Sequence, residues 1–298
     1  MRQGAYAKTH IDKPDDLTGD GDSWKELADR VSERQKDDPE VGTTLLRMIS
    51  RLDERLPFAT ASGVFDNGCG TGGVISHILD AFGSKIPDSA TISASDFSKA
   101  MLEKTAERKE ANISAGKPVW DRLQLHSLDA HNLSTIADGS VSHVTGGHVY
   151  FLLSNPRQAL KETHRILRPG GVLALSSGKG SQHLDALHDA VEVIRPGSNF
   201  HLLQEPWASE AGVKGELEAC GFVDTEAFPV ESEMRYEKHE EFANLLLVMP
   251  AMKVALESYT EDEKKRLFVE VVEALRARNP AEPGTLTGTS IVALGRRG

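Results

Sequence analysis

Three glycines at alternate positions stand behind an acid in residues 64–73, which read Val-Phe-Asp-Asn-Gly-Cys-Gly-Thr-Gly-Gly. Glycine permits a tight backbone turn and leaves room for a ligand beside the main chain. An apolar segment with helical spacing follows at once, so the unpaired N–H groups of a helix N-terminus would face the same space. A strand, a glycine turn and a helix N-terminus together predict a nucleotide-binding site, with a tight turn that binds no ligand as the simpler alternative.

The glycine spacing alone does not choose the nucleotide, because it also fits the G-x-G-x-x-G fingerprint of dinucleotide-binding proteins. Further candidates follow the later strands that the sequence predicts, and open parallel sheets bind ligands beyond the carboxyl ends of their strands. Asp96 could accept hydrogen bonds from both ribose hydroxyls, and Phe97 could stack on a purine. Asp129 could accept from an exocyclic amine, and Gly147-His148 follows a fourth strand.

The elements that must position these residues alternate between strand and helix. Apolar and β-branched runs predict strands at residues 63–66, 90–95, 123–126, 140–145, 172–176, 222–230 and 289–294. Helical spacing and capping residues predict helices at residues 73–83, 99–115, 155–167, 181–195, 209–220 and 239–278, with two more before the first strand, from Ser23 and around residues 45–56. This alternation predicts an α/β fold with a mostly parallel sheet covered by helices on both faces.

Composition narrows the function classes. The chain has 298 residues, a net charge of −11 and 39% hydrophobic residues. A net negative charge without a basic cluster argues against nucleic acid as a partner. Only two cysteines and no apolar run of membrane-spanning length predict a cytoplasmic protein without disulfides or membrane insertion. The histidines show no metal-binding spacing, so we expect no metal, a small-molecule substrate, and a monomer or homodimer.

With these residues in place, the chain resembles the class I S-adenosylmethionine-dependent methyltransferases. The resemblance is closest to the small-molecule branch, which includes the ubiquinone and menaquinone methyltransferases. The motifs that carry it are Asp66-x-Gly68-x-Gly70-x-Gly72, Ser95-Asp96-Phe97-Ser98-x-x-Met101-Leu102, Leu128-Asp129-Ala130, Asn155-Pro156 and Leu167-Arg168-Pro169-Gly170-Gly171-Val172-Leu173. It implies a Rossmann-like seven-stranded sheet with an antiparallel last strand, and S-adenosylmethionine as cofactor.

The resemblance also implies roles for the matching positions. At the methionine end of the cofactor, Gly68, Gly70 and Gly72 would pass beside the ligand, and Asp66 and the backbone near Gly147 would face its amino group.

At the nucleoside end, the resemblance implies that Asp96 binds the ribose and that Phe97 flanks the adenine. Asp129 and the amide of Ala130 would read the adenine edge.

We divide the chain into an N-terminal arm with cap helices at residues 1–60, a cofactor-binding core at residues 61–180, and the rest of the core at residues 181–298. The last part contains a helical lid insertion at about residues 239–280, whose apolar residues favour a hydrophobic acceptor.

Side chains that could line an acceptor pocket are His148, Tyr150, Phe151, Lys179, Trp207 and Tyr6. His148 directly follows the fourth strand and is the best candidate for a general base or an orienting group. A structural histidine is an equal alternative, and Tyr150, Phe151 and Trp207 could equally be packing residues.

The sequence therefore predicts methyl transfer to a small, fairly apolar acceptor, such as a secondary metabolite or a quinone-like compound, at O, N, S or C. Two alternatives keep the cofactor without methyl transfer, namely a regulatory protein and a cyclase. An NAD-dependent dehydrogenase ranks lower, because about sixty residues precede the glycine turn, whereas the dinucleotide motif usually stands near the start of its domain.

Overall fold

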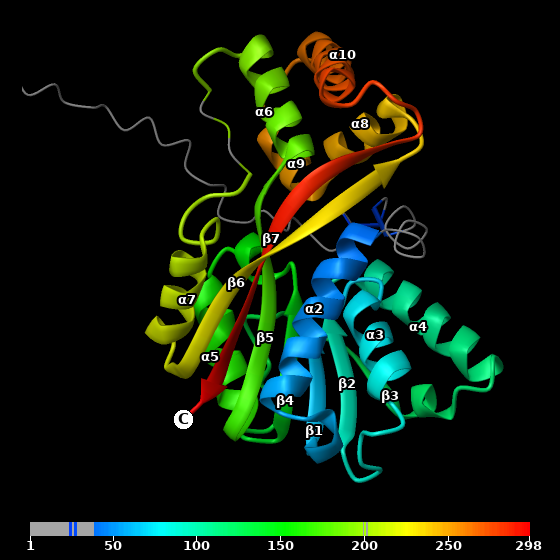
Figure 1. The fold of residues 1–298 in the computed structure, drawn as a ribbon, viewed down its shortest axis with the longest axis vertical. Coiled ribbons are helices and arrows are strands. Elements are labelled where there is room, and N and C mark those ends of the chain that lie inside the picture. Colours follow the sequence, from blue (N-terminus) through cyan, green and yellow to red (C-terminus); the bar gives the residue numbers. More distant parts are fainter. Residues whose placement is uncertain (1–23, 26, 29–38, 199, 201) are drawn as a thin grey trace, which may run out of the picture.

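A computed structural model describes the chain except for residues 1–23, 26, 29–38, 199 and 201. Seven strands form one sheet in the order β3-β2-β1-β4-β5-β7-β6 (Figure 1). They are β1 (Gly63–Asn67), β2 (Thr91–Asp96), β3 (Leu123–Ser127), β4 (Val141–Gly147), β5 (Leu167–Ser181), β6 (Phe222–Tyr236) and β7 (Gly284–Arg297). β1 to β5 are parallel, and β7 runs antiparallel to both β5 and β6. The predicted seven-stranded sheet with an antiparallel last strand is confirmed.

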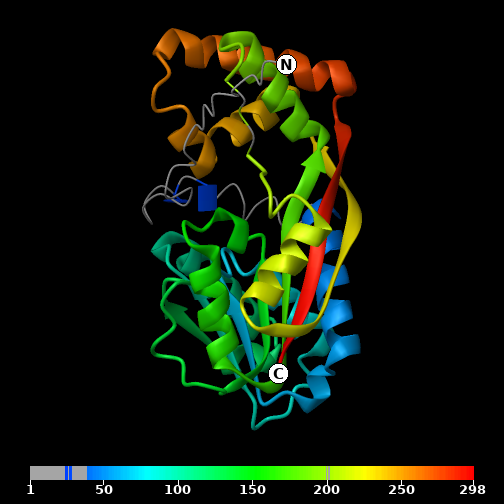
Figure 2. The ribbon, with the colours of Figure 1, turned by 90° about the vertical axis from the view of Figure 1, so that its left-hand side faces the viewer.

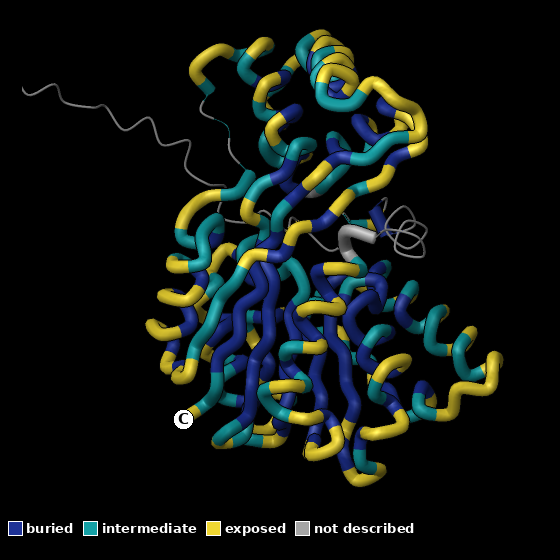
Figure 3. The backbone as a smooth tube through the Cα atoms, viewed as in Figure 1, coloured by how far each residue is buried: buried dark blue, intermediate teal, exposed yellow. Residues whose placement is uncertain are grey.

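Helices cover both faces of the sheet (Figure 2). α2 (Pro39–Arg55) and α3 (Gly73–Phe82) pack in one hydrophobic cluster with β1 and β2, and α4 (Lys99–Ser114) lies beside them. α5 (Pro156–Ile166) and α7 (Glu210–Ala219) pack in a second cluster on the other face. The central strands between these layers are buried (Figure 3).

Helix starts follow the capping residues of the sequence. Ser98 accepts a hydrogen bond from the Met101 amide, and Asn155 accepts one from the Gln158 amide ahead of Pro156. The capping box of Thr260 and Glu263 opens α10 (Glu261–Arg278). The capping box expected at Ser23 lies outside the described residues.

β6 and β7 extend well beyond the lengths expected from the sequence. They stay paired from Phe222 opposite Arg297 to Tyr236 opposite Gly284. The added part of β6 reads Glu231-Ser-Glu-Met-Arg-Tyr236. In this stretch buried Ser232 and Tyr236 alternate with exposed Glu231, Glu233 and Arg235, which is the period of a strand, but the small number of apolar residues weakens the signal.

This extension carries a second group of helices, seen at the top of Figure 1. It consists of α6 (Gln182–Ile194), α8 (His239–Leu247), α9 (Pro250–Ala255) and α10, which share a third hydrophobic cluster. α6 packs against α10 although about 70 residues separate them in the sequence. Within the described residues, no helix is both long and apolar enough to cross a membrane.

Candidate functional site

The glycine turn after β1 has a backbone that favours glycine at all three alternate positions, with φ of 69° at Gly68, 53° at Gly70 and 83° at Gly72. The reasons for glycine differ between them. A Cβ on Gly68 would lie 2.5 Å from Val149 Cγ2, so this glycine is needed for packing. A Cβ on Gly70 would meet nothing within 4 Å. The turn therefore leaves open space beside Gly70.

Asp96 fastens this turn to the end of β2. Its Oδ2 accepts a hydrogen bond from the Gly70 amide at 2.9 Å, and its Oδ1 accepts one from the Ser98 amide at 2.9 Å. Burial raises the pKa of Asp96, and these amide hydrogen bonds oppose the rise. A carboxylate has about four lone-pair positions, so both oxygens can accept further hydrogen bonds from a ligand.

Asp66 is fully buried at the end of β1. Its Oδ1 accepts a hydrogen bond from the Thr145 hydroxyl at 2.7 Å, whereas its Oδ2 has no hydrogen-bond partner among the described residues. Burial raises the pKa of Asp66 to about 7, although the Thr145 hydroxyl and the Ile75 main chain both favour the ionised form. A buried carboxylate oxygen without a partner is well suited to a cationic ligand group.

The residues expected at the adenine end follow the ends of β2 and β3. Trp24 meets Phe97 edge to face, with ring centroids 6.4 Å apart. Asp129 follows β3, and its Oδ1 accepts a hydrogen bond from the His131 amide at 2.8 Å. Ala130 beside it is buried.

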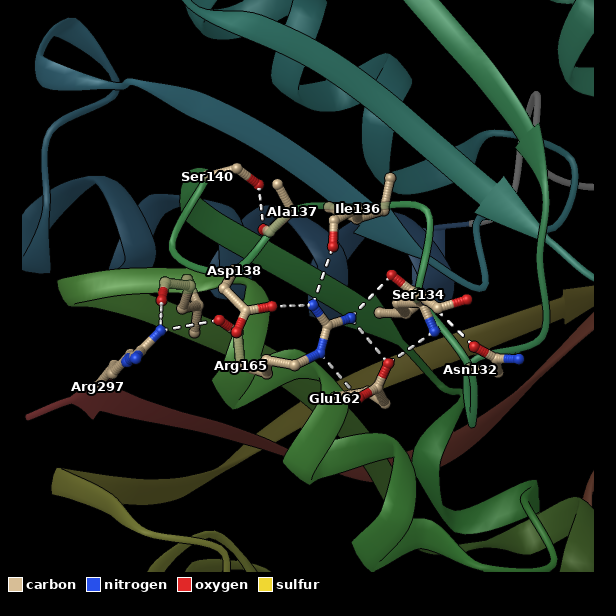
Figure 4. A network of polar contacts seen from close by, with 11 residues as sticks. Asn132, Ser134, Ile136, Ala137, Asp138, Ser140, Glu162, Arg165 and Arg297 are labelled. Carbon is tan, nitrogen blue, oxygen red and sulfur yellow. Dashed lines mark hydrogen bonds and ion pairs between the residues drawn. The ribbon is translucent and has the colours of Figure 1, made fainter.

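Arg165 of α5 holds the loop that follows Asp129 (Figure 4). It donates to the carbonyl oxygens of Leu133 and Ile136 at 2.8 and 3.0 Å. It also pairs with Asp138 and with Glu162, whose Oε2 accepts from the Leu133 amide at 2.8 Å. Residues 133–138 are thus fastened to α5.

Replacing Arg165 with methionine should lower the free energy of unfolding by about 2–4 kcal/mol, because two carbonyls and two carboxylates lose their charged donor. It should also weaken cofactor binding a few-fold by loosening the loop after Asp129. Urea unfolding and calorimetry measure both effects. Arg276→Met is the control, since Arg276 pairs with Glu273 one turn earlier on α10 and both side chains are largely exposed; it should cost at most about 1 kcal/mol. Equal losses in the two variants would contradict this role for Arg165.

A cavity of about 240 Å³ lies between the sheet and the second helical group. Its apolar wall is formed by Phe151, Leu152, Leu184, Leu202, Leu203, Met234, Met249 and Ala251. Its polar groups come from Thr44, His148, Ser181, His183, Thr289 and Ser290. We call this cavity the acceptor pocket.

The loop from Gly147 to Leu152 separates the acceptor pocket from the glycine turn. On one side, the Val149 side chain packs on Gly68, and a Cβ on Gly147 would meet Val74 at 2.7 Å. On the other side, His148, Phe151 and Leu152 line the pocket. One short loop therefore contacts both sites.

His148 has a φ of 56° directly after β4. Its Nδ1 lies 3.0 Å from Ser176 Oγ, and its Nε2 lies 3.4 Å from Ser290 Oγ. Burial lowers the pKa of His148 to about 4, so its imidazole is neutral at neutral pH.

The other residues expected to line the acceptor pocket lie at different positions in the structure. Phe151 lines the pocket, but Tyr150 is fully buried and stacks with Trp207 in the core, 6.5 Å between centroids. Neither Tyr150 nor Trp207 is among the residues that line the acceptor pocket. Lys179 pairs with Glu210 at 2.7 Å and is not among the lining residues. Tyr6 lies outside the described residues.

Several pocket residues were not predicted, among them Thr44, His183 and Leu203. They come from α2, from α6 and from the segment before α7. These segments lie far apart in the sequence, so no sequence motif connects them. Within the part of the chain that the structure describes, no group of three metal-ligating side chains occurs.

Comparison with known proteins agrees with this architecture. The family model of a methyltransferase domain matches residues 65–175, which run from Phe65 in β1 to Leu175 in β5 and include the glycine turn. Methyltransferase ucsB from an Acremonium species is 29% identical over 289 residues, 96% of each chain. The demethylmenaquinone methyltransferase of Staphylococcus epidermidis is 34% identical over 112 residues, 38% of this chain and 41% of its own.

Among solved structures, the YcgJ protein of Bacillus subtilis has a similar fold, with a TM-score of 0.53 at 15% identity. The match covers 84% of this chain and 97% of that one. The methyltransferase matches favour a methyltransferase over a dinucleotide-binding protein, so the cofactor is S-adenosylmethionine. Residues 65–175 therefore form a methyltransferase domain, in a chain that is similar over 96% of its length to methyltransferase ucsB and has the seven-stranded fold.

Proposed function

We propose that the chain methylates a small, fairly apolar acceptor that binds in the acceptor pocket. The observation that carries this proposal is the loop of residues 147–152, which contacts the glycine turn on one side and lines the pocket on the other. A donor bound at the glycine turn and an acceptor in the pocket would therefore be neighbours.

The residues at the glycine turn fit S-adenosylmethionine. When bound, this cofactor supplies a methyl group already activated on a positively charged sulfur. The open space beside Gly70 could hold its methionine part. Gly68, Gly72 and the Gly147 backbone would then lie beside the ligand. The unpartnered Oδ2 of Asp66 would accept a hydrogen bond from the amino group.

The nucleoside part would lie at the ends of β2 and β3. We propose that Asp96 accepts from the ribose hydroxyls, while Phe97 flanks the adenine. Asp129 and the Ala130 amide would then read the adenine edge. The Trp24 ring against Phe97 supports this placement, because it adds apolar surface where a planar base would pack.

The pocket supports the choice of acceptor. Its volume lies below the range of roughly 300–1,000 Å³ usual for ligand pockets, so a small molecule is favoured. Its wall is mostly leucine, methionine and phenylalanine, which favours an apolar body. The few polar groups, His148 among them, would orient the atom to be methylated. What the protein contributes is positioning and the exclusion of water.

A panel of phenols, quinols, thiols and amines with S-adenosylmethionine would test this function, with S-adenosylhomocysteine release measured by mass spectrometry. His148→Leu should lower turnover of the preferred acceptor by about tenfold through the loss of one hydrogen bond. The dissociation constant for S-adenosylmethionine should not change. His183→Leu is the companion variant, since His183 lines the same pocket from α6 in the second helical group. Tight cofactor binding without turnover of any acceptor would favour a regulatory protein or a cyclase instead.

A further inference from the structure

Two neighbouring strands present serine hydroxyls to the two ring nitrogens of His148. Ser176 is on β5 and Ser290 is on β7, where Ser290 pairs with Gly178. Ser176 Oγ accepts a hydrogen bond from the His148 main-chain N–H at 3.0 Å, and the same oxygen lies 3.0 Å from Nδ1. The longer contact, 3.4 Å, joins Nε2 to Ser290 Oγ at the pocket wall.

The hydrogen atoms can be assigned from these contacts. A serine hydroxyl has one hydrogen to donate, and a neutral imidazole carries a hydrogen on only one nitrogen. Ser176 Oγ already accepts the main-chain N–H of His148. The Ser176 hydroxyl lies 3.0 Å from Nδ1, whereas the Ser290 hydroxyl lies 3.4 Å from Nε2, so Ser176 has the better placed contact for its hydrogen. If Nδ1 carried the hydrogen, the buried Ser176 hydroxyl would lose its acceptor at 3.0 Å. The Nε2–H form costs the Ser290 hydroxyl a weaker contact at 3.4 Å, so the Nε2–H form is favoured.

We propose that Ser176 holds His148 with its hydrogen on Nε2, as a hydrogen-bond donor toward the acceptor pocket, so that the enzyme selects an acidic oxygen acceptor, a phenol or an enol, bound as its anion. Ser176 is thus a positioning residue. The proposal rests on the proposed function, because it names the class of acceptor for the same pocket.

The chemistry of the site agrees with a donor rather than a base. A hydrogen bond given to an anion favours the ionised form, so an acceptor that has lost its proton to solvent is bound preferentially. The low pKa of His148 keeps the imidazole neutral and makes it a poor proton acceptor at neutral pH. The protein then has no proton to remove during methyl transfer.

The hydrogen position can be measured without any substrate. Nitrogen NMR of the full chain labelled at histidine distinguishes the two neutral forms, and His148→Gln identifies the signal. We expect the Nε2–H form of His148 between pH 6 and pH 8. Ser176→Ala should shift it toward a mixture of the two forms. Ser177→Ala is the matched control, because Ser177 Oγ donates to the Trp207 carbonyl at 2.8 Å. A wild-type Nδ1–H form, or no change in Ser176→Ala, would overturn the proposal and leave methyl transfer itself untouched.

Acceptor selection is tested with two probes of similar shape in the presence of S-adenosylhomocysteine. They are 2-hydroxy-1,4-naphthoquinone, an anion at neutral pH, and 1,4-naphthoquinone, which has no acidic hydroxyl. We expect at least about tenfold tighter binding of the anion, and loss of most of this preference in Ser176→Ala but not in Ser177→Ala. Equal binding, or binding of neither probe, would overturn the selection of an acidic oxygen. Methyl transfer to thiols or amines in the acceptor panel would then show that the proposed function still stands.

Discussion

Gly70→Ala should abolish measurable binding of S-adenosylmethionine while the protein still folds. The new methyl group would meet no protein atom within 4 Å, but it would project into the space proposed for the cofactor. Alanine at the positive φ of residue 70 should lower the free energy of unfolding by about 1–2 kcal/mol. We expect the dissociation constant to rise by more than about a hundredfold, measured by calorimetry.

Gly116→Ala provides the control for backbone strain. Gly116 has a φ of 79°, and a Cβ added to it would also meet nothing within 4 Å, but it lies after α4, away from the turn. It should lose a similar amount of stability and keep normal cofactor binding. If Gly70→Ala bound the cofactor as tightly as Gly116→Ala does, the open space beside Gly70 would not be the cofactor site.

Asp66→Asn should stabilise the protein and weaken the cofactor complex. The pKa of Asp66 is raised from 3.8 to about 7, so the folded state holds a proton that the unfolded state has lost between these values. Its contribution to stability therefore falls as the pH rises through that window. Asparagine cannot ionise, so the variant should gain about 2–4 kcal/mol over the wild type at pH 8 and almost nothing at pH 4.

Cofactor affinity should show the opposite trend. A bound cation favours ionised Asp66, so wild-type affinity should rise by about tenfold from pH 6 to pH 8, with release of a proton. In Asp66→Asn this rise should vanish, and affinity at pH 8 should fall by about 10- to 100-fold. Calorimetry in buffers of different ionisation enthalpy measures how many protons are released when the cofactor binds. Asp129→Asn, at an exposed carboxylate, should keep the proton release. Persistence of the release in Asp66→Asn would assign it to another group.

Local sequence patterns were enough to predict the glycine turn and the strand end that contacts it. Gly68, Gly70 and Gly72 have the positive φ that glycine allows. Asp96, at the end of β2, accepts a hydrogen bond from the Gly70 amide in this turn. Ser98, Asn155 and Thr260 each directly precede the first residue of a helix, as the capping preference of these residue types predicts. These features depend on residues close in sequence or on the common rule that parallel strands end at one edge of a sheet.

The acceptor half could not be predicted in the same way. His148 and Phe151 were found because they follow a strand end, but Thr44, His183 and Leu203 reach the pocket only through the packing of distant elements. Tyr150 and Trp207 are aromatic residues beside the site whose stacking on each other in the core has no signal in the sequence. The β6–β7 extension, which carries the second helical group, alternates buried with exposed side chains, but it contains few apolar residues, so its length was not predicted.

The most direct test of the account is a crystal structure of the complex with S-adenosylhomocysteine. We predict that its amino group lies against Asp66, that its ribose hydroxyls lie against Asp96, and that its sulfur faces the acceptor pocket beside His148. Binding at the glycine turn with the sulfur directed away from this pocket, or binding elsewhere on the protein, would contradict the central claim that the loop of residues 147–152 joins donor and acceptor.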